Sequence, residues 1–234
     1  MPLLLTTHPF PDTTFGLWQI AEKESFFREE LPLSHTEEAE MVRLKNDLRR
    51  HEWLASRWLL HKLTGAPQRL PLAKDAFSKP FFPENQHLAC SLSHSHGIVG
   101  AFILNEQRTT NNQQQITCGC DIQVLVPKMP RLAPKFLNLK ESKFVQKHTA
   151  SAQYDLFHVF WTAKESLYKA YGLKALDFRA HLRVEPFKWK ENTGAAKGWV
   201  EKDNFRQAYQ LHFEKIFLPG DAGELVWTVC LPEG

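Results

Sequence analysis

Apolar residues recur at helical spacing in two stretches of the chain. In the first, Ser34 and Glu37 have the spacing of a capping box, and apolar side chains then repeat every three or four positions up to Leu63, shortly before Gly65. This pattern predicts one long helix or two broken ones. In the second stretch, residues 155–171 predict a helix that ends at Gly172, because glycine commonly terminates helices.

Shorter apolar runs between turn residues predict strands. They cover residues 88–93, 98–104, 116–126, 182–189, 198–200, 209–217 and 225–231. Prolines and scattered aromatic residues in positions 1–33 favour short strands and turns, and four prolines in 66–87 favour loop and edge structure. We also expect a loop over 127–134 and a weak helix over 135–150.

A wholly polar segment runs from Asn105 to Gln115 between two apolar runs. Such a segment is typical of a connection between folded parts. We therefore predict two subdomains, residues 1–110 and residues 111–234.

Composition and charge exclude several classes of protein. The 234 residues are 43% hydrophobic and 24% charged, as in ordinary globular proteins, which excludes disorder, collagen and coiled coil. No apolar run approaches the roughly 20 residues of a membrane span, so we expect a soluble, cytoplasmic protein. Four cysteines are too few for a disulfide scaffold, which favours reduced thiols. A net charge of +3 suits an acidic partner but is too small to indicate nucleic acid.

The predicted helix 155–171 carries charged residues in two settings. On a helical wheel Glu165 and Lys169 share one arc with Thr162, which for most helices means a solvated ion pair. Lys164 instead lies in the apolar arc, where a lysine must either extend its ammonium group to water or meet a buried anion. The apolar arc consists of Phe157, Phe160, Trp161, Leu167, Tyr168 and Tyr171.

A polar pair interrupts the predicted strand around Asp121. Asp121 and Gln123 lie on one face, and Cys118, Cys120 and Ile122 lie on the other. Asp121 is either a buried aspartate bonded within the protein or a ligand for a hard cation, completed by a carboxylate from elsewhere.

Residues 91–97 read Ser-Leu-Ser-His-Ser-His-Gly and lie between two predicted strands. Such a segment forms either a phosphate-binding site or a polar turn. His94 and His96, together with Cys118 and Cys120, also allow a zinc site, although structural zinc sites usually place two to four residues between cysteines.

Three segments of the chain resemble, in their order along the sequence, the motifs of the larger, single-chain (Sfp-like) class of 4′-phosphopantetheinyl transferases. They are Ser93-His94, Gly119-Cys120-Asp121-Ile122-Gln123, and Trp161-Thr162-Ala163-Lys164-Glu165-Ser166-Leu167-Tyr168-Lys169. The last is the most specific. Residues 55–60 and Lys79-Pro80 resemble weaker motifs of the same family.

The resemblance implies transfer of the 4′-phosphopantetheine arm of coenzyme A to a serine of an apo acyl or peptidyl carrier protein, with release of 3′,5′-ADP. It implies an α/β fold of two similar subdomains, each a small, mainly antiparallel sheet packed with a helix, with coenzyme A in the cleft between them. The enzyme would be of the holo-[acyl-carrier-protein] synthase type and would act as a monomer, without nucleic acid or membrane.

The resemblance also implies roles for individual residues. Asp121 and Glu165 would bind Mg²⁺, or Mn²⁺, beside the coenzyme A pyrophosphate, and Glu165 would take the proton from the carrier serine. Lys169 would stabilise the leaving phosphate. Further contacts to coenzyme A are expected from Arg57, Lys79, Ser93, His94, Lys164 and Lys169.

Gln123 departs from the family pattern, which usually has a second acid at this position. An amide oxygen can coordinate a metal but brings no charge, so we expect weaker metal binding. The alternative hypothesis is a catalytically weak protein of the same fold that binds coenzyme A or a carrier.

Overall fold

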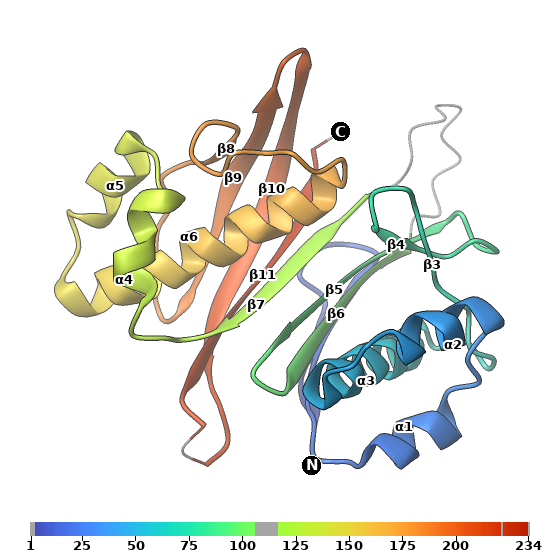
Figure 1. Ribbon diagram of the computed structural model, residues 1–234. Coiled ribbons are helices and arrows are strands. Elements are labelled where there is room, and N and C mark those ends of the chain that lie inside the picture. The colour runs from blue at the N-terminus through green and yellow to red at the C-terminus, as the bar shows by residue number, and fades with distance from the viewer. Residues whose placement is uncertain (1–2, 106–116, 221, 234) are drawn as a thin grey trace. The chain divides into compact units, whose positions relative to one another are not determined.

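The computed structural model describes residues 3–105, 117–220 and 222–233. Two compact units make up the chain, Met1–Cys118 and Gly119–Gly234 (Figure 1). This division lies eight residues beyond the proposed one at 110/111. The connection predicted from Asn105 to Gln115 lies, after Asn105, outside the described residues.

The first unit is an antiparallel sheet with the order β1-β2-β6-β5 and a long helix, α3, packed on β6 and β2. Its elements are β1 (Leu3–Thr7), β2 (Thr13–Gln19), α1 (Glu24–Glu30), α2 (His35–Val42), α3 (Asp47–Thr64), β3 (Ala73–Lys74), β4 (Pro80–Phe81), β5 (Leu88–Ser95) and β6 (Ile98–Asn105). The capping box of Ser34 and Glu37 starts α2, as predicted. The helical stretch is broken, because α2 ends at Val42 and a second cap, Asn46, starts α3.

The second unit is an antiparallel five-stranded sheet with the order β7-β11-β10-β9-β8. Its elements are β7 (Gly119–Val124), α4 (Met129–Leu132), the 3₁₀ helix η1 (Ala133–Lys135), α5 (Leu139–Val145), α6 (Ala150–Tyr171), β8 (Leu182–Val184), β9 (Thr193–Lys202), β10 (Phe205–Phe217) and β11 (Glu224–Pro232). Together the two units confirm the predicted α/β class with antiparallel sheets packed against helices.

Helix α6 crosses the sheet of the second unit and packs most closely on β7 and β11 (Figure 1). Thr149 caps its start, five residues before the predicted one, and Gly172 ends it in the left-handed conformation at φ 75°. A side chain at Gly119 would place its Cβ 2.0 Å from the Ser166 carbonyl oxygen. Only glycine therefore permits this approach, which sets the next residues of β7 beside the last turns of α6.

All four cysteines are buried thiols rather than disulfides, as predicted, and they are Cys90, Cys118, Cys120 and Cys230. Among the residues that the structure describes, no helix is long and apolar enough to cross a membrane.

Candidate active site on strand β7 and helix α6

Asp121 and Lys169 form an ion pair between β7 and α6. The Lys169 Nζ donates to Asp121 Oδ1 at 2.8 Å and to the Cys120 carbonyl oxygen at 3.0 Å. Burial lowers the pKa of the Lys169 ammonium, but the carboxylates of Asp121 and Glu165 outweigh burial and leave that pKa above its ordinary value. Lys169 is therefore a cation at neutral pH, held against the strand rather than extended into water.

Glu165 lies one turn before Lys169 on α6 and is half-buried. Burial raises the pKa of its carboxyl, the negative charge of Asp121 raises it further, and Lys169 offsets only part of this, so the pKa is raised to about 7. Two carboxyl groups thus repel each other in a site with little water. A carboxyl with a pKa near neutrality is also typical of a group that exchanges protons during catalysis.

The carboxylates of Asp121 and Glu165 fit a hard divalent cation. Mg²⁺ prefers oxygen ligands, keeps several waters, and commonly uses only one or two carboxylates together with substrate phosphates. Gln123 shares the face of Asp121, and its Nε2 donates to the Val124 carbonyl oxygen at 2.8 Å. Any contribution of Gln123 to a ligand set would therefore come from its amide oxygen.

Ser93, His94 and Lys79 belong to the first unit. Ser93 is buried on β5, and the next residue, His94, is exposed, with its Nδ1 2.9 Å from Glu52 Oε2 on α3. The Lys79 ammonium bonds to the Thr117 hydroxyl. Asp121, Gln123, Glu165 and Lys169 all lie in the second unit.

Arg57, predicted as a phosphate contact, is buried within the first unit. Its guanidinium stacks 3.5 Å above the Trp53 ring, bonds Glu40 at 3.3 Å and lies 3.8 Å from Glu37. Burial lowers its pKa to about 9, although the charge of Glu37 opposes this change. These contacts fix α3 against α2, so Arg57 is a core residue.

Lys164, also predicted to contact coenzyme A, is fully buried within the second unit. Its Nζ donates to Glu141 Oε2 at 2.7 Å, to the Phe136 carbonyl oxygen at 2.7 Å and to the Phe178 carbonyl oxygen at 2.8 Å. All three ammonium hydrogens thus have acceptors inside the protein, and none is left for a phosphate. Of the two settings predicted for a lysine in the apolar arc, the buried anion is the one observed.

Glu141 is a residue that the sequence analysis did not single out. Besides Lys164, it accepts hydrogen bonds from the backbone nitrogens of Asn138 at 2.8 Å and Val184 at 3.0 Å. It therefore joins α5, α6 and β8 around the base of the candidate site. The capping-box spacing of Asn138 and Glu141 was a signal for its place at the start of a helix, but not for its contact with Lys164.

The segment that carries this site is similar to a known protein family. Residues 117–230 match the family model of the 4′-phosphopantetheinyl transferase superfamily. This segment of the chain belongs to that superfamily. No curated protein matches the chain.

The superfamily match covers two of the three predicted motifs. It contains residues 119–123 and 161–169, and with them Asp121, Glu165 and Lys169. The Ser93-His94 motif lies outside the matched segment. The zinc hypothesis gains no support, because across residues 3–105, 117–220 and 222–233 no three His, Cys, Asp or Glu side chains form a group that could hold a metal.

His158 lies on α6 before the turns that carry Glu165 and Lys169, and it makes the stability of the protein depend on pH. Its ring is fully buried, with Nδ1 2.9 Å from the Tyr154 carbonyl oxygen and Nε2 accepting from the Val126 nitrogen at 2.9 Å. Since Nε2 must accept, the folded protein holds a neutral ring, and burial lowers the pKa of His158 below 6.5.

We therefore expect the stabilising contribution of His158 to be complete above pH 6.5 and to be lost as the pH falls, because the unfolded chain then binds a proton that the folded chain excludes. Urea unfolding from pH 8 to 5 measures this effect. His158→Gln should show a smaller fall in unfolding free energy than the unsubstituted protein. Burial also lowers the pKa values of His61 and His212, which remain in both proteins. Equal falls in unfolding free energy would therefore contradict a contribution from His158.

Proposed function

We propose that this protein transfers the 4′-phosphopantetheine arm of coenzyme A to a serine of an apo acyl or peptidyl carrier protein and releases 3′,5′-ADP. The observation that supports this most directly is the arrangement of Asp121, Glu165 and Lys169 inside the segment that matches the superfamily. We also propose that the enzyme is an Sfp-like monomer of the holo-[acyl-carrier-protein] synthase type, located in the cytoplasm.

Asp121 and Glu165 would hold Mg²⁺, or Mn²⁺, with Gln123 contributing its amide oxygen. When bound, the cation neutralises negative charge on the pyrophosphate of coenzyme A. The two carboxylates suit this role because a bound cation would offset the burial and the mutual repulsion that raise the pKa of Glu165.

Glu165 and Lys169 would carry the proton and charge changes of the reaction. Glu165 accepts the proton of the carrier serine, whose oxygen then forms a bond to the phosphorus that bears the pantetheine arm. The bond from that phosphorus to the bridging oxygen breaks, and 3′,5′-ADP leaves with the electron pair. Lys169, protonated at neutral pH, stabilises the departing phosphate oxygen.

For the first unit we propose that Ser93, His94 and Lys79 contact the phosphates of coenzyme A. Arg57 and Lys164 are not part of this proposal, because both are buried and bonded within the protein.

Intact-mass spectrometry of a carrier protein tests the transfer. Purified apo carrier incubated with this protein, coenzyme A and Mg²⁺ should gain the mass of one phosphopantetheine, and EDTA should abolish the gain. A protein that binds coenzyme A but modifies no carrier from several classes would instead support the alternative of a catalytically weak binding protein, for which the uncharged Gln123 is the structural reason.

Gln123→Glu is expected to strengthen metal binding. A third carboxylate on the face of Asp121 adds a charged oxygen ligand, so half-maximal activity should need about tenfold less Mg²⁺, the equivalent of one favourable charge contact. Mg²⁺ titration of the initial rate measures this change. Gln123→Ala is the matched control, and an equal effect of both substitutions would exclude a role for position 123 in metal binding.

A further inference from the structure

Glu52 is a buried carboxylate of the first unit, outside the group formed by Asp121, Glu165 and Lys169. It lies in the second turn of α3 and is 4% exposed. A buried carboxylate is costly unless hydrogen bonds or an opposite charge replace the water that it has lost. The partners of Glu52 therefore indicate its role.

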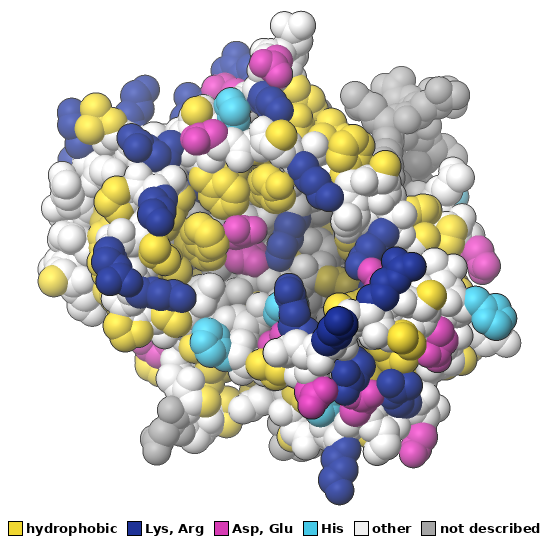
Figure 2. Space-filling model, in the orientation of Figure 1, with side chains coloured by type: hydrophobic (Ala, Val, Ile, Leu, Met, Phe, Trp, Pro, Cys, Tyr) yellow, Lys and Arg dark blue, Asp and Glu magenta, His cyan; other side chains and the backbone are white. Residues whose placement is uncertain are grey.

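The ion pair of Glu52 differs from those of other acids on the same helices. Figure 2 shows acidic and basic side chains intermixed over the helices of the first unit. Acids there pair with lysine or arginine, for example Glu24 with Arg50 and Glu40 with Lys74. Glu52 forms its ion pair with a histidine instead.

The two carboxylate oxygens of Glu52 bind two neighbouring points of the hairpin formed by β5 and β6. Oε2 accepts from His94 Nδ1 at 2.9 Å, and Oε1 accepts from the Gly97 backbone nitrogen at 3.2 Å. His96 and Gly97 form the turn of this hairpin, with φ 52° and 75°. Two positive φ angles are typical of the tight turns that hairpins favour. Glu52 thus fixes both His94 and the adjoining turn to α3.

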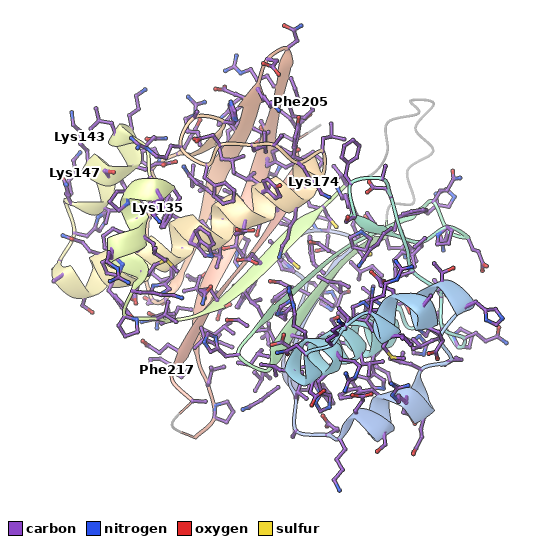
Figure 3. The ribbon with its side chains drawn as sticks, in the orientation of Figure 1. Lys135, Lys143, Lys147, Lys174, Phe205 and Phe217 are labelled. Carbon is purple, nitrogen blue, oxygen red and sulfur yellow. The ribbon has the colours of Figure 1, made fainter. Side chains whose placement is uncertain are left out.

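His94 lies on the face of the sheet that α3 covers. Alternate side chains of a strand share a face, and Leu92 and Cys90, two and four positions earlier, pack in the core that α3 forms with the sheet. Side chains fill the space between α3 and these strands (Figure 3). Because β5 is an edge strand, the His94 side chain remains 44% exposed and accessible to a ligand.

The contact with Glu52 limits the states in which His94 can bind an anion. An ionised carboxylate only accepts hydrogen bonds, so Nδ1 of His94 carries a hydrogen. In a neutral ring Nε2 would then be an acceptor and would repel phosphate oxygens. In the imidazolium Nε2 is a donor, and a carboxylate at hydrogen-bond distance favours this charged form. Glu52 therefore favours the one state of the ring that can donate to an anion from Nε2.

We propose that Glu52 is a positioning residue for His94, which it orients and holds as an imidazolium that donates from Nε2 to a phosphate group of coenzyme A. This inference rests on the proposed function, which assigns His94 to those phosphates, and it adds the residue on which that contact depends. The same preparation is not expected of His96, whose Nδ1 lies 3.1 Å from the Ser95 hydroxyl oxygen rather than beside a carboxylate.

Calorimetric binding of coenzyme A, with no carrier protein present, tests the proposal. Glu52→Gln keeps an oxygen that accepts from Nδ1 but removes the negative charge, and we expect it to bind about tenfold more weakly. Glu38→Gln is the matched control, because Glu38 is exposed on α2, and it should bind within about twofold of the unsubstituted protein. In a protein that already carries His94→Ala, Glu52→Gln should cause little further loss.

A role of Glu52 in folding alone predicts different results. It would weaken binding equally with and without His94, and that outcome would overturn the proposal. Glu52→Asp restores the charge and should recover part of the affinity that Glu52→Gln loses. The NMR signals of the His94 ring nitrogens at neutral pH should move toward those of a neutral ring in Glu52→Gln, and unchanged signals would also overturn the proposal.

Failure of this proposal is distinguishable from failure of the proposed function. Unchanged coenzyme A binding by Glu52→Gln, together with transfer to a carrier, overturns the positioning role and leaves the transferase intact. Coupled loss of binding through Glu52 and His94, in a protein that modifies no carrier, supports the positioning role and overturns the transferase.

Discussion

Glu165→Gln is expected to lower the rate of phosphopantetheine transfer by about 10²–10⁴-fold. Glutamine has nearly the shape of glutamate, but it cannot accept the proton of the carrier serine and brings no charge to a bound cation. Stability should not fall, because the substitution removes a carboxyl that burial and Asp121 both disfavour in its charged form. Initial rates from carrier mass, together with thermal unfolding, measure the two effects separately.

Glu29→Gln is the matched control for this substitution. Glu29 is exposed on α1, so the same chemical change should leave the rate within about twofold. A Glu165→Gln protein that retained more than a tenth of the rate would argue against Glu165 as the base.

Lys164→Met is expected to destabilise the protein by about 3–5 kcal/mol. Methionine fills much of the same volume, but it leaves Glu141 with an unpaired charge in the interior and removes the donor to the carbonyl oxygens of Phe136 and Phe178. Urea unfolding of the purified protein measures the loss.

Adding Glu141→Gln to Lys164→Met should recover part of that loss, since the amide removes the uncompensated charge and keeps an oxygen acceptor. The double-variant cycle gives the coupling between the two residues. Lys164→Met should leave the KM for coenzyme A unchanged where the protein is folded. A raised KM without loss of stability would return Lys164 to the role of a phosphate contact.

Local signals predicted much of the secondary structure. The caps at Ser34 and Gly172 marked true helix ends because they depend only on neighbouring residues. The strand periodicity before Asn105 and near the C-terminus was also correct in type. Helix α1 was missed, because its seven residues lack a side-chain cap and contain two adjacent phenylalanines that fit a strand equally well.

The contacts of the candidate residues are long-range, and the sequence did not predict them. Glu165 and Lys169 share a wheel arc, as predicted, but Lys169 pairs with Asp121, which is 48 positions earlier. Lys164 meets Glu141 across 23 positions and Arg57 meets Glu40 across 17. No spacing rule covers such separations in sequence. A motif can therefore indicate which residues form a site, but not which residues each of them contacts.

The four buried thiols allow local opening of the folded protein to be measured by chemical labelling. An alkylating reagent reaches a buried sulfur only when the surrounding strands open, so the labelling rate of each cysteine measures a local opening free energy. Cys90 lies on β5 and Cys230 on β11, in different units. Comparing their labelling rates therefore shows whether the two sheets open together or separately, without the addition of any foreign probe.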